Sequence, residues 1–146
     1  ILMNPVAQAQ QDTVEEFQLF EDWMARYEHI IDLGKALPDF PVEWRTEENR
    51  IRGCQSQVWF QIEMQKSGQM NIQGISDAAI VSGLIAILLR VYNDQKPNDI
   101  LDAGPEFISD IGFDEHLSPT RSNGLHAMLK VIYEQAAVNM ANSKPA

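Results

Sequence analysis

Hydrophobic residues near the start of the chain recur every three or four positions, at Phe17, Phe20, Met24, Tyr27 and Ile31. That spacing places them on one face of an α-helix. The segment Thr13-Val14-Glu15-Glu16 fits a capping box, so the helix is predicted to begin there and to end near Gly34. Residues 1–11 are then expected to form a flexible N-terminal segment, and residues 38–49 a loop around a short helical turn.

Apolar and polar side chains alternate in the middle of the chain, with apolar residues at Val58, Phe60, Ile62 and Met64. This two-residue period is typical of a β-strand with one buried face. The segment Lys66-Ser67-Gly68-Gln69 predicts a hairpin turn, because Gly68 adopts positive φ without strain, and a return strand begins at Met70. A further short strand is expected at Arg50–Arg52, which places Cys54 in the connection before the long strand.

The following helix is expected to lie in the core. Ser76 is its predicted N-cap and Asp77 its first residue. The helix is apolar almost all round, at Ile80, Val81, Leu84, Ile85, Ile87, Leu88, Leu89 and Val91. A helix without a polar face belongs in the interior of a domain.

Helical patterns then continue to the end of the chain. Two short helices are predicted at 98–103 and 105–111, and Ser118-Pro119 supplies the N-cap and first residue of a long final helix. Helices, then one cluster of strands, then helices again indicate the α+β class. The prediction is a single domain, residues 1–146, in which a small antiparallel sheet of about three strands packs against several helices.

Charge and composition narrow the range of functions. Twenty-one acidic residues against eleven Lys and Arg give a net charge of −10, which repels nucleic acids and anionic membranes. No apolar run reaches the roughly 18 residues that a membrane span needs. His29, His116 and His126 lie on separate predicted elements, so no metal site is expected. One cysteine cannot form an internal disulfide, and a reducing cytoplasm is the expected location.

Cys54 is the first candidate for chemistry. A lone cysteine is ordinarily a buried apolar filler. Here Gly53 and the polar Gln55 place it in a turn, and arginines cluster upstream although the chain is acidic. Two interpretations remain open: Arg50 and Arg52 stabilise a thiolate or contact an acidic partner, or they pair in solvent with nearby glutamates.

Arg121 is the second candidate. It lies about three residues into the final helix, where the helix dipole disfavours a cation by roughly 0.3–1 kcal/mol. This unfavourable position invites a tertiary explanation, such as an ion pair or an anion site. Asp77 needs none, because the dipole stabilises an acid in the first turn, and capping is its default role.

Three segments in register carry a resemblance to a known family. They are Gly53-Cys54-Gln55-Ser56-Gln57-Val58-Trp59, then Ser76-Asp77-Ala78-Ala79-Ile80-Val81-x-Gly83-Leu84, then His116-Leu117-Ser118-Pro119-x-Arg121-Ser122-x-Gly124-Leu125. Together they resemble the SufE family, the sulfur-acceptor proteins of iron–sulfur cluster assembly. The similarity runs from about Phe17 to the end of the final helix.

The resemblance implies an α+β fold related to that of the IscU cluster scaffold. It also implies that Cys54 takes the outer persulfide sulfur from a SufS-type, PLP-dependent cysteine desulfurase, stimulates that enzyme and passes the sulfur to the SufBCD scaffold complex. The PLP belongs to the partner, so no cofactor is expected on this chain, which acts as a carrier rather than an enzyme. The residues expected to bind the partner or support the thiolate are Arg121, Asp77, Arg52, Arg50 and Gln55.

Three alternatives accompany this hypothesis. The nearest is a CsdE-type acceptor that serves a sister desulfurase. The second is a thiol enzyme, such as a peroxidase, that acts alone. The third is an interaction module in which Cys54 is inert.

Overall fold

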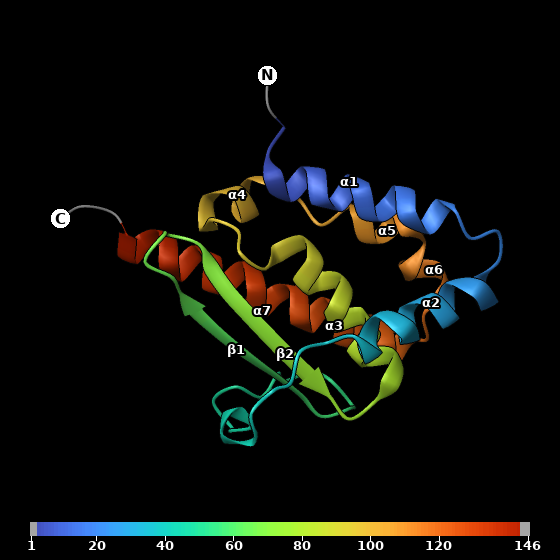
Figure 1. Cartoon of the computed structure of the whole chain (residues 1–146), viewed down its shortest axis with the longest axis horizontal. Coiled ribbons are helices and arrows are strands. Elements are labelled where there is room, and N and C mark those ends of the chain that lie inside the picture. Colours follow the sequence, from blue (N-terminus) through green and yellow to red (C-terminus); the bar gives the residue numbers. More distant parts are fainter. Residues whose placement is uncertain (1–2, 144–146) are drawn as a thin grey trace.

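A hairpin of two strands lies along one side of a group of helices in the computed structural model, which describes residues 3–143 (Figure 1). The predicted α+β class is confirmed. In chain order the elements are α1 (Pro5–Gln18), α2 (Trp23–Lys35), the 3₁₀ helix η1 (Val42–Trp44), β1 (Val58–Met64), β2 (Met70–Ser76), α3 (Ala79–Tyr92), α4 (Pro97–Asp102), α5 (Phe107–Ile111), α6 (Phe113–His116) and α7 (Pro119–Ser143).

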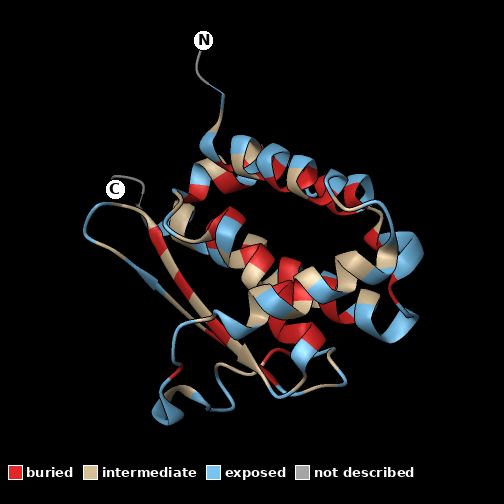
Figure 2. Cartoon of the chain, turned by 45° about the vertical axis from the view of Figure 1, so that its right-hand side comes forward, coloured by how far each residue is buried: buried red, intermediate tan, exposed pale blue. Residues whose placement is uncertain are grey.

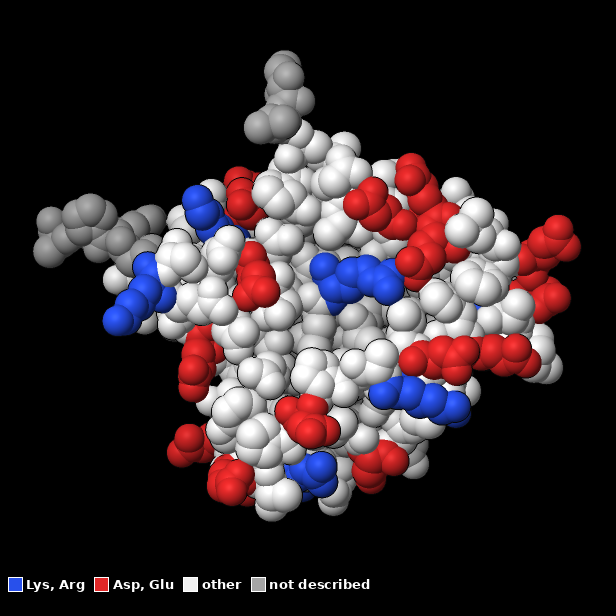
Figure 3. All heavy atoms as spheres, in the orientation of Figure 1, with Lys and Arg blue, Asp and Glu red and all other residues white. Residues whose placement is uncertain are grey.

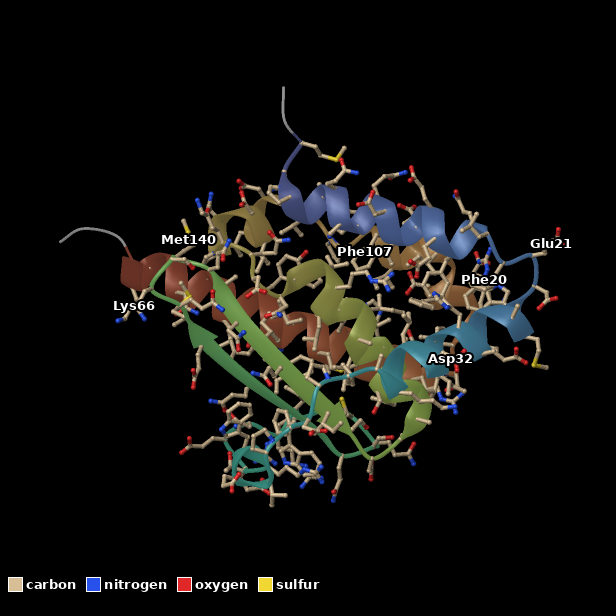
Figure 4. The ribbon with its side chains drawn as sticks, in the orientation of Figure 1. Phe20, Glu21, Asp32, Lys66, Phe107 and Met140 are labelled. Atoms are coloured by element: carbon tan, nitrogen blue, oxygen red, sulfur yellow. The ribbon has the colours of Figure 1, made fainter. Side chains whose placement is uncertain are left out.

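The hairpin forms as its alternation predicts. The two strands are antiparallel, in a register that runs from Val58 opposite Ser76 to Met64 opposite Met70. Gly68 takes φ +89° in the turn between them. The Lys66 side chain marks this turn in Figure 4. Cys54 precedes β1 and therefore lies toward the other end of the sheet.

The expected third strand is wrong. Arg50 forms an isolated bridge with Trp59, and the segment 49–51 adds only that bridge to the sheet. The Ile51 N–H donates to the Val58 carbonyl at 2.9 Å. After Ile51 the chain turns away from β1, so the pairing does not extend into a third strand.

Helix α3 forms the centre of the core, as its all-round apolar sequence predicts. It contacts α1, α2, α7 and β2. Buried positions concentrate on the inward sides of these elements (Figure 2). Its fully or nearly fully buried side chains are Leu84, Ile85, Ile87, Leu88, Val91 and Tyr92. Each such side chain stabilises the fold by roughly 1.5–3 kcal/mol relative to an exposed one.

The N-terminal helix begins earlier than predicted. The Asn4 Oδ1 atom accepts the Val6 N–H at 2.8 Å, and Pro5 occupies the first helical position. Val6 is fully buried, so the expectation of a flexible segment is wrong for residues 5–11; residues 1–2 lie outside the described part. Thr13 caps nothing, because its hydroxyl donates to the Ala9 carbonyl inside the helix.

The single helix predicted from residue 13 to 34 is two helices. Helix α1 ends at Gln18, and Asp22 begins α2 by accepting the Ala25 N–H at 2.8 Å. In Figure 4, Phe20 and Glu21 lie at the corner between them. The hydrophobic spacing continues across this corner although Met24, at the start of α2, is exposed, so periodicity alone does not reveal the break.

The C-terminal helices follow the predicted order with shifted bounds. The helix expected at 105–111 begins at Phe107, and Gly112, with φ +101°, separates it from α6. Helix α7 begins at Pro119, and the Ser118 hydroxyl accepts the Arg121 N–H at 3.4 Å, as expected of an N-cap. None of the helices within residues 3–143 combines the length and apolarity needed to cross a bilayer.

Helices α2 and α3 cross with their backbones in contact. A Cβ built on Gly83 would lie 2.1 Å from the Ile30 carbonyl oxygen and 2.5 Å from its Cγ2 atom. One on Gly34 would lie 2.6 Å from the Gly83 nitrogen. Only glycine at both positions allows this separation between the helices.

We therefore expect Gly83→Ala to destabilise the protein by about 1–3 kcal/mol, because the two helices must move apart. Gly124→Ala is the matched control: it is also helical, but its new Cβ would meet only the Cys54 Sγ atom, at an ordinary 3.5 Å. The control gains up to about 1 kcal/mol from helix propensity. Urea unfolding measures both, and equal stability of the two variants would contradict the crossing argument.

Candidate functional site

Cys54 lies in a short loop whose ends are held together. Residues 52–57 connect Ile51 to Val58, and the hydrogen bond between those two residues closes the loop. Gly53 has φ +92°, in the left-handed region that favours glycine, and turns the chain toward α7. The hydrogen bond between Ile51 and Val58 therefore fixes the base of the loop, and the turn at Gly53 places the thiol beside α7.

The thiol points into a small pocket rather than into solvent. Cys54 is half-buried, and its Sγ atom lies 3.7 Å from the Gly124 carbonyl oxygen on α7, to which the S–H donates. The pocket is lined by Cys54, Gln55, Ser56, Val81, Leu84, Thr120, Arg121, Gly124, Leu125 and Met128. Its free volume of about 20 Å³ is room for little more than a water molecule.

Burial raises the pKa of the Cys54 thiol above its ordinary value. Desolvation disfavours the thiolate, and the S–H bond to a carbonyl oxygen favours the neutral form as well. The resting thiol is therefore a weak nucleophile at neutral pH, since the thiolate is the reactive species.

Arg50 and Arg52 do not activate this thiol in the structure. Their guanidinium groups lie 3.7 Å and 3.4 Å from the Glu47 carboxylate. Neither lines the Cys54 pocket. Of the two interpretations left open by the sequence, the structure favours pairing with a glutamate, and the clustering of arginines reflects that local pairing.

Arg121 and Gln55 do lie beside the thiol. Both line the Cys54 pocket, and both line a wider, more polar recess next to it of about 390 Å³, with Ser118 and Thr120. No carboxylate in residues 3–143 lies within ion-pair distance of the Arg121 guanidinium. The unfavourable place of Arg121 near the helix N-terminus thus has no internal ion pair to offset it.

Asp77 holds the loop and does not cap α3. Its Oδ1 atom accepts the Gln57 N–H at 3.0 Å, and its own N–H donates to the Gln57 carbonyl at 3.3 Å. Helix α3 starts two residues later, with Ala78 in extended conformation at the cap position and the Ser76 hydroxyl accepting the Ala78 N–H. The predicted capping roles of Ser76 and Asp77 are wrong, because the strand continues to Ser76.

Sequence reasoning did not single out the apolar wall of the pocket. Val81 and Leu84 come from α3, and Leu125 and Met128 from α7. They carry no signal beyond the hydrophobic periodicity of two core helices, so only the packing of those helices reveals that they surround the thiol.

Candidate metal ligands do not gather near Cys54. His29 pairs with Glu16 at 2.7 Å, and His126 lies 3.3 Å from Asp114. Across the described part of the chain no three His, Cys, Asp or Glu side chains come together as a metal site.

Comparison with known proteins agrees with this geometry. The profile of the SufE domain, described as an Fe–S metabolism associated domain, matches residues 11–136. An uncharacterised SufE-like protein of Rhizobium etli is 44% identical over 133 residues, which cover 88% of this chain and 89% of the relative. The solution structure of a hypothetical protein from Thermus thermophilus shares the fold, with a TM-score of 0.75 over 91% of this chain and 96% of that one, at 19% identity.

The domain match over residues 11–136 identifies the class as a protein associated with iron–sulfur metabolism. The chain belongs to the SufE family, as its three sequence segments indicated. Membership implies a sulfur-transfer role, and it confirms the family resemblance found in the sequence.

The raised pKa predicts the pH dependence of Cys54 alkylation. Because this is the only cysteine, the rate of reaction with iodoacetamide reports it alone. The rate should rise with pH to a midpoint above that of the same segment in urea-unfolded protein. The thiol has a higher pKa in the folded protein than in the unfolded one. The stability contributed by the neutral thiol is therefore complete below the unfolded pKa and is lost as pH rises through the folded pKa.

The control variants Arg50→Gln and Arg52→Gln should leave the midpoint of the alkylation rate unchanged. A midpoint below that of the unfolded protein would contradict the site described above.

The Asp77 hydrogen bond predicts a faster-reacting variant. Asp77→Ala removes the acceptor of the Gln57 N–H, worth about 1 kcal/mol, so the loop opens more often and alkylation of Cys54 speeds up roughly fivefold. Asp77→Asn keeps an acceptor oxygen at the same place and should react close to the wild-type rate. Identical rates for the alanine variant and wild type, with both proteins folded by circular dichroism, would show that Asp77 does not restrain the loop.

Proposed function

We propose that Cys54 accepts one sulfur atom as a persulfide from a SufS-type, PLP-dependent cysteine desulfurase and passes it to a SufBCD-type scaffold. The chain then serves as a carrier that stimulates the desulfurase, in the cytoplasm, with no cofactor of its own. The observation that carries this proposal is the lone thiol in a pocket that has space for about one further atom beside it.

The transfer step is a balanced thiol exchange. The Cys54 thiolate attacks the outer sulfur of the donor persulfide, a new S–S bond forms on Cys54, and the donor cysteine leaves as a thiolate. The proton of the Cys54 thiol goes to solvent or to a partner base. No net oxidation occurs, so neither a metal nor a redox cofactor is required.

Transfer requires Cys54 to leave its pocket. In this structure the half-buried Sγ atom faces Gly124 and apolar side chains, which restrict the approach of a persulfide held by another protein. We propose that docking of the desulfurase shifts the 52–57 loop outward, which exposes the thiol and relieves the desolvation that raises its pKa. The closed pocket would then protect the loaded persulfide from small thiols.

Arg121 is the proposed contact for the partner. Its guanidinium is free of internal ion pairs in the described residues, and it stands at the rim of the recess beside Cys54. A carboxylate of the desulfurase would satisfy it and would be drawn close to the loop that must open. Gln55, on the same rim, would contribute polar contacts to this interface.

The properties of the closed site weigh against an enzyme acting alone. A stand-alone peroxidase needs a thiolate of lowered pKa beside a cation, whereas burial raises the pKa of Cys54. A partner that opens the loop would remove the burial that raises the pKa of Cys54. The thiol would then be activated only where a sulfur donor is present.

Mass spectrometry of the intact protein tests the proposal. After incubation with a SufS-type desulfurase, PLP and cysteine under anaerobic conditions, we expect the wild-type chain to gain the mass of one sulfur atom, and Cys54→Ser to gain nothing. The desulfurase should also release sulfide faster with the wild-type chain and a reductant than with Cys54→Ser. Equal stimulation by both proteins would mean that Cys54 is inert and that the chain acts by binding alone.

A further inference from the structure

The outer edge of β1 is covered along its first half only. There the segment 49–51 runs beside the strand, and the Phe60 N–H donates to the Asn49 carbonyl at 2.9 Å. Outward-facing backbone groups recur at every second residue of an antiparallel strand. The N–H and C=O groups of Ile62 and Met64 therefore face the same way as those of Phe60, away from β2.

These outward groups have no partner within residues 3–143. No hydrogen bond of the described chain reaches the N–H or C=O of Ile62, or the N–H of Met64, from outside the hairpin. The chain that covers Phe60 has turned away before it reaches Ile62. A gap in the sheet is left where one more strand would fit.

The opposite edge of the hairpin is paired at its Met70 and Ile72 positions, although no hydrogen bond within residues 3–143 reaches the outward N–H or C=O of Gly74. On β2 the Asn93 side chain accepts the Ile72 N–H at 2.7 Å. The Gln95 carbonyl accepts the Met70 N–H at 2.8 Å, and the Asp94 N–H donates to the Met70 carbonyl at 2.8 Å. Residues 61–64 of β1 hold no proline or bulge, two of the features with which proteins protect an open edge, and their single charged side chain is the acidic Glu63.

A groove follows this edge. It lies between β1, the segment 48–51 and the middle of α7, and its free volume is about 380 Å³. Its lining residues are Glu48, Asn49, Arg50, Ile51, Phe60, Ile62, Val131, Glu134 and Gln135. Apolar side chains of Ile62 and Val131 are thus accessible beside the unpaired backbone.

Charge around the groove is acidic. Glu48 and Glu134 line it, and the one arginine there, Arg50, is already paired with Glu47 at 3.7 Å. Glu134 has only a loose contact, 3.9 Å, to Lys130 on the same helix. The whole chain carries −10, and acidic side chains outnumber basic ones on the face that holds the hairpin (Figure 3).

We infer that residues 61–64 of β1 accept an extended, basic segment of a partner protein as an added strand. Only another extended backbone offers N–H and C=O groups at the spacing of an open edge. Its alternate side chains would reach the apolar residues of the groove and the acidic residues at its rim. A second copy of this chain is disfavoured as the occupant, because both copies would carry the same net charge of −10.

This site is distinct from the Cys54 pocket. The two share no lining residue, although successive turns of α7 contribute to both, Arg121 to Met128 to one and Val131 to Gln135 to the other. A partner held at the β1 edge would therefore leave the loop with Cys54 free to open. The inference does not depend on the proposed sulfur transfer.

Amide hydrogen exchange tests the inference with a peptide of alternating lysine and valine, seven residues long, on ¹⁵N-labelled protein. At a peptide concentration about ten times Kd, exchange of the Ile62 and Met64 amides should slow about tenfold. The Gln61 and Glu63 amides already face β2 in the ladder and serve as internal controls whose exchange stays nearly constant.

Two matched peptides separate strand addition from general attraction. In one peptide, the residues whose N–H groups would face β1 are N-methylated, and this peptide should not slow the exchange of the Ile62 and Met64 amides. In the other, the intervening residues are N-methylated, and this peptide should still slow that exchange. Met64→Pro removes an outward donor without breaking a bond to β2, and it should weaken peptide binding severalfold in a folded protein.

Several results would overturn the inference. Unchanged exchange at Ile62 and Met64 at millimolar peptide is one, and equal binding of both N-methylated peptides is another. Equal binding of a glutamate–valine peptide would remove the role of charge. Protection of these amides without peptide, together with a dimeric mass in solution, would show that a second copy occupies the edge instead.

Discussion

The close crossing of α2 and α3 is the constraint on which the rest of the structure depends. Gly34 and Gly83 let the two backbones touch, and this contact fixes the position of α3 within the core. Helix α3 then presents Val81 and Leu84 to α7, where they form one wall of the Cys54 pocket. The geometry of the thiol is thus set by a contact between two helices, neither of which carries it.

Cys54 is held by several weak restraints rather than one strong one. The S–H bond to Gly124, the Asp77 bond to Gln57 and the apolar walls each contribute on the order of 1 kcal/mol. Their sum keeps the loop closed in the free protein. It also stays within the free energy that a protein interface supplies, so the proposed opening of the loop on docking is energetically feasible.

Much of the fold was predictable because its signals are local. The alternation from Val58 gave the bounds of β1, and the all-apolar run identified α3 as the core helix. Signals of this kind depend on which face of a strand or helix is buried, and the spacing of apolar residues two to four positions apart indicates that face.

The errors have a common physical cause. Thr13 and Ser76 are good N-cap residue types, but Asn4-Pro5 starts α1 earlier and the β2 ladder extends through Ser76. Capping propensity is worth about 1 kcal/mol, less than the burial of Val6 or the pairing of a strand end, so tertiary packing decides where each element begins.

The site was predictable in part for the same reason. Cys54 stands out as the only thiol, and Arg121 as a cation in an unfavourable place, and the structure brings them to the same pocket. The arginines near Cys54 in sequence proved misleading, because both pair with Glu47 and neither lines the thiol pocket. Proximity along the chain is a poor guide to electrostatics when an acidic residue lies within the same turn.

A single long helix connects the functional features of the molecule. Near its N-terminus α7 supplies Arg121, the Gly124 carbonyl and Met128 to the thiol pocket, and farther along it borders the open edge of β1. Residues 48–51 line the groove and lead directly into the loop that carries Cys54, so a partner bound along the strand edge would touch the base of that loop. The hydrogen bond between Ile51 and Val58 closes that base beside the bridge between Arg50 and Trp59, so contacts at the edge would reach the thiol only through this pairing.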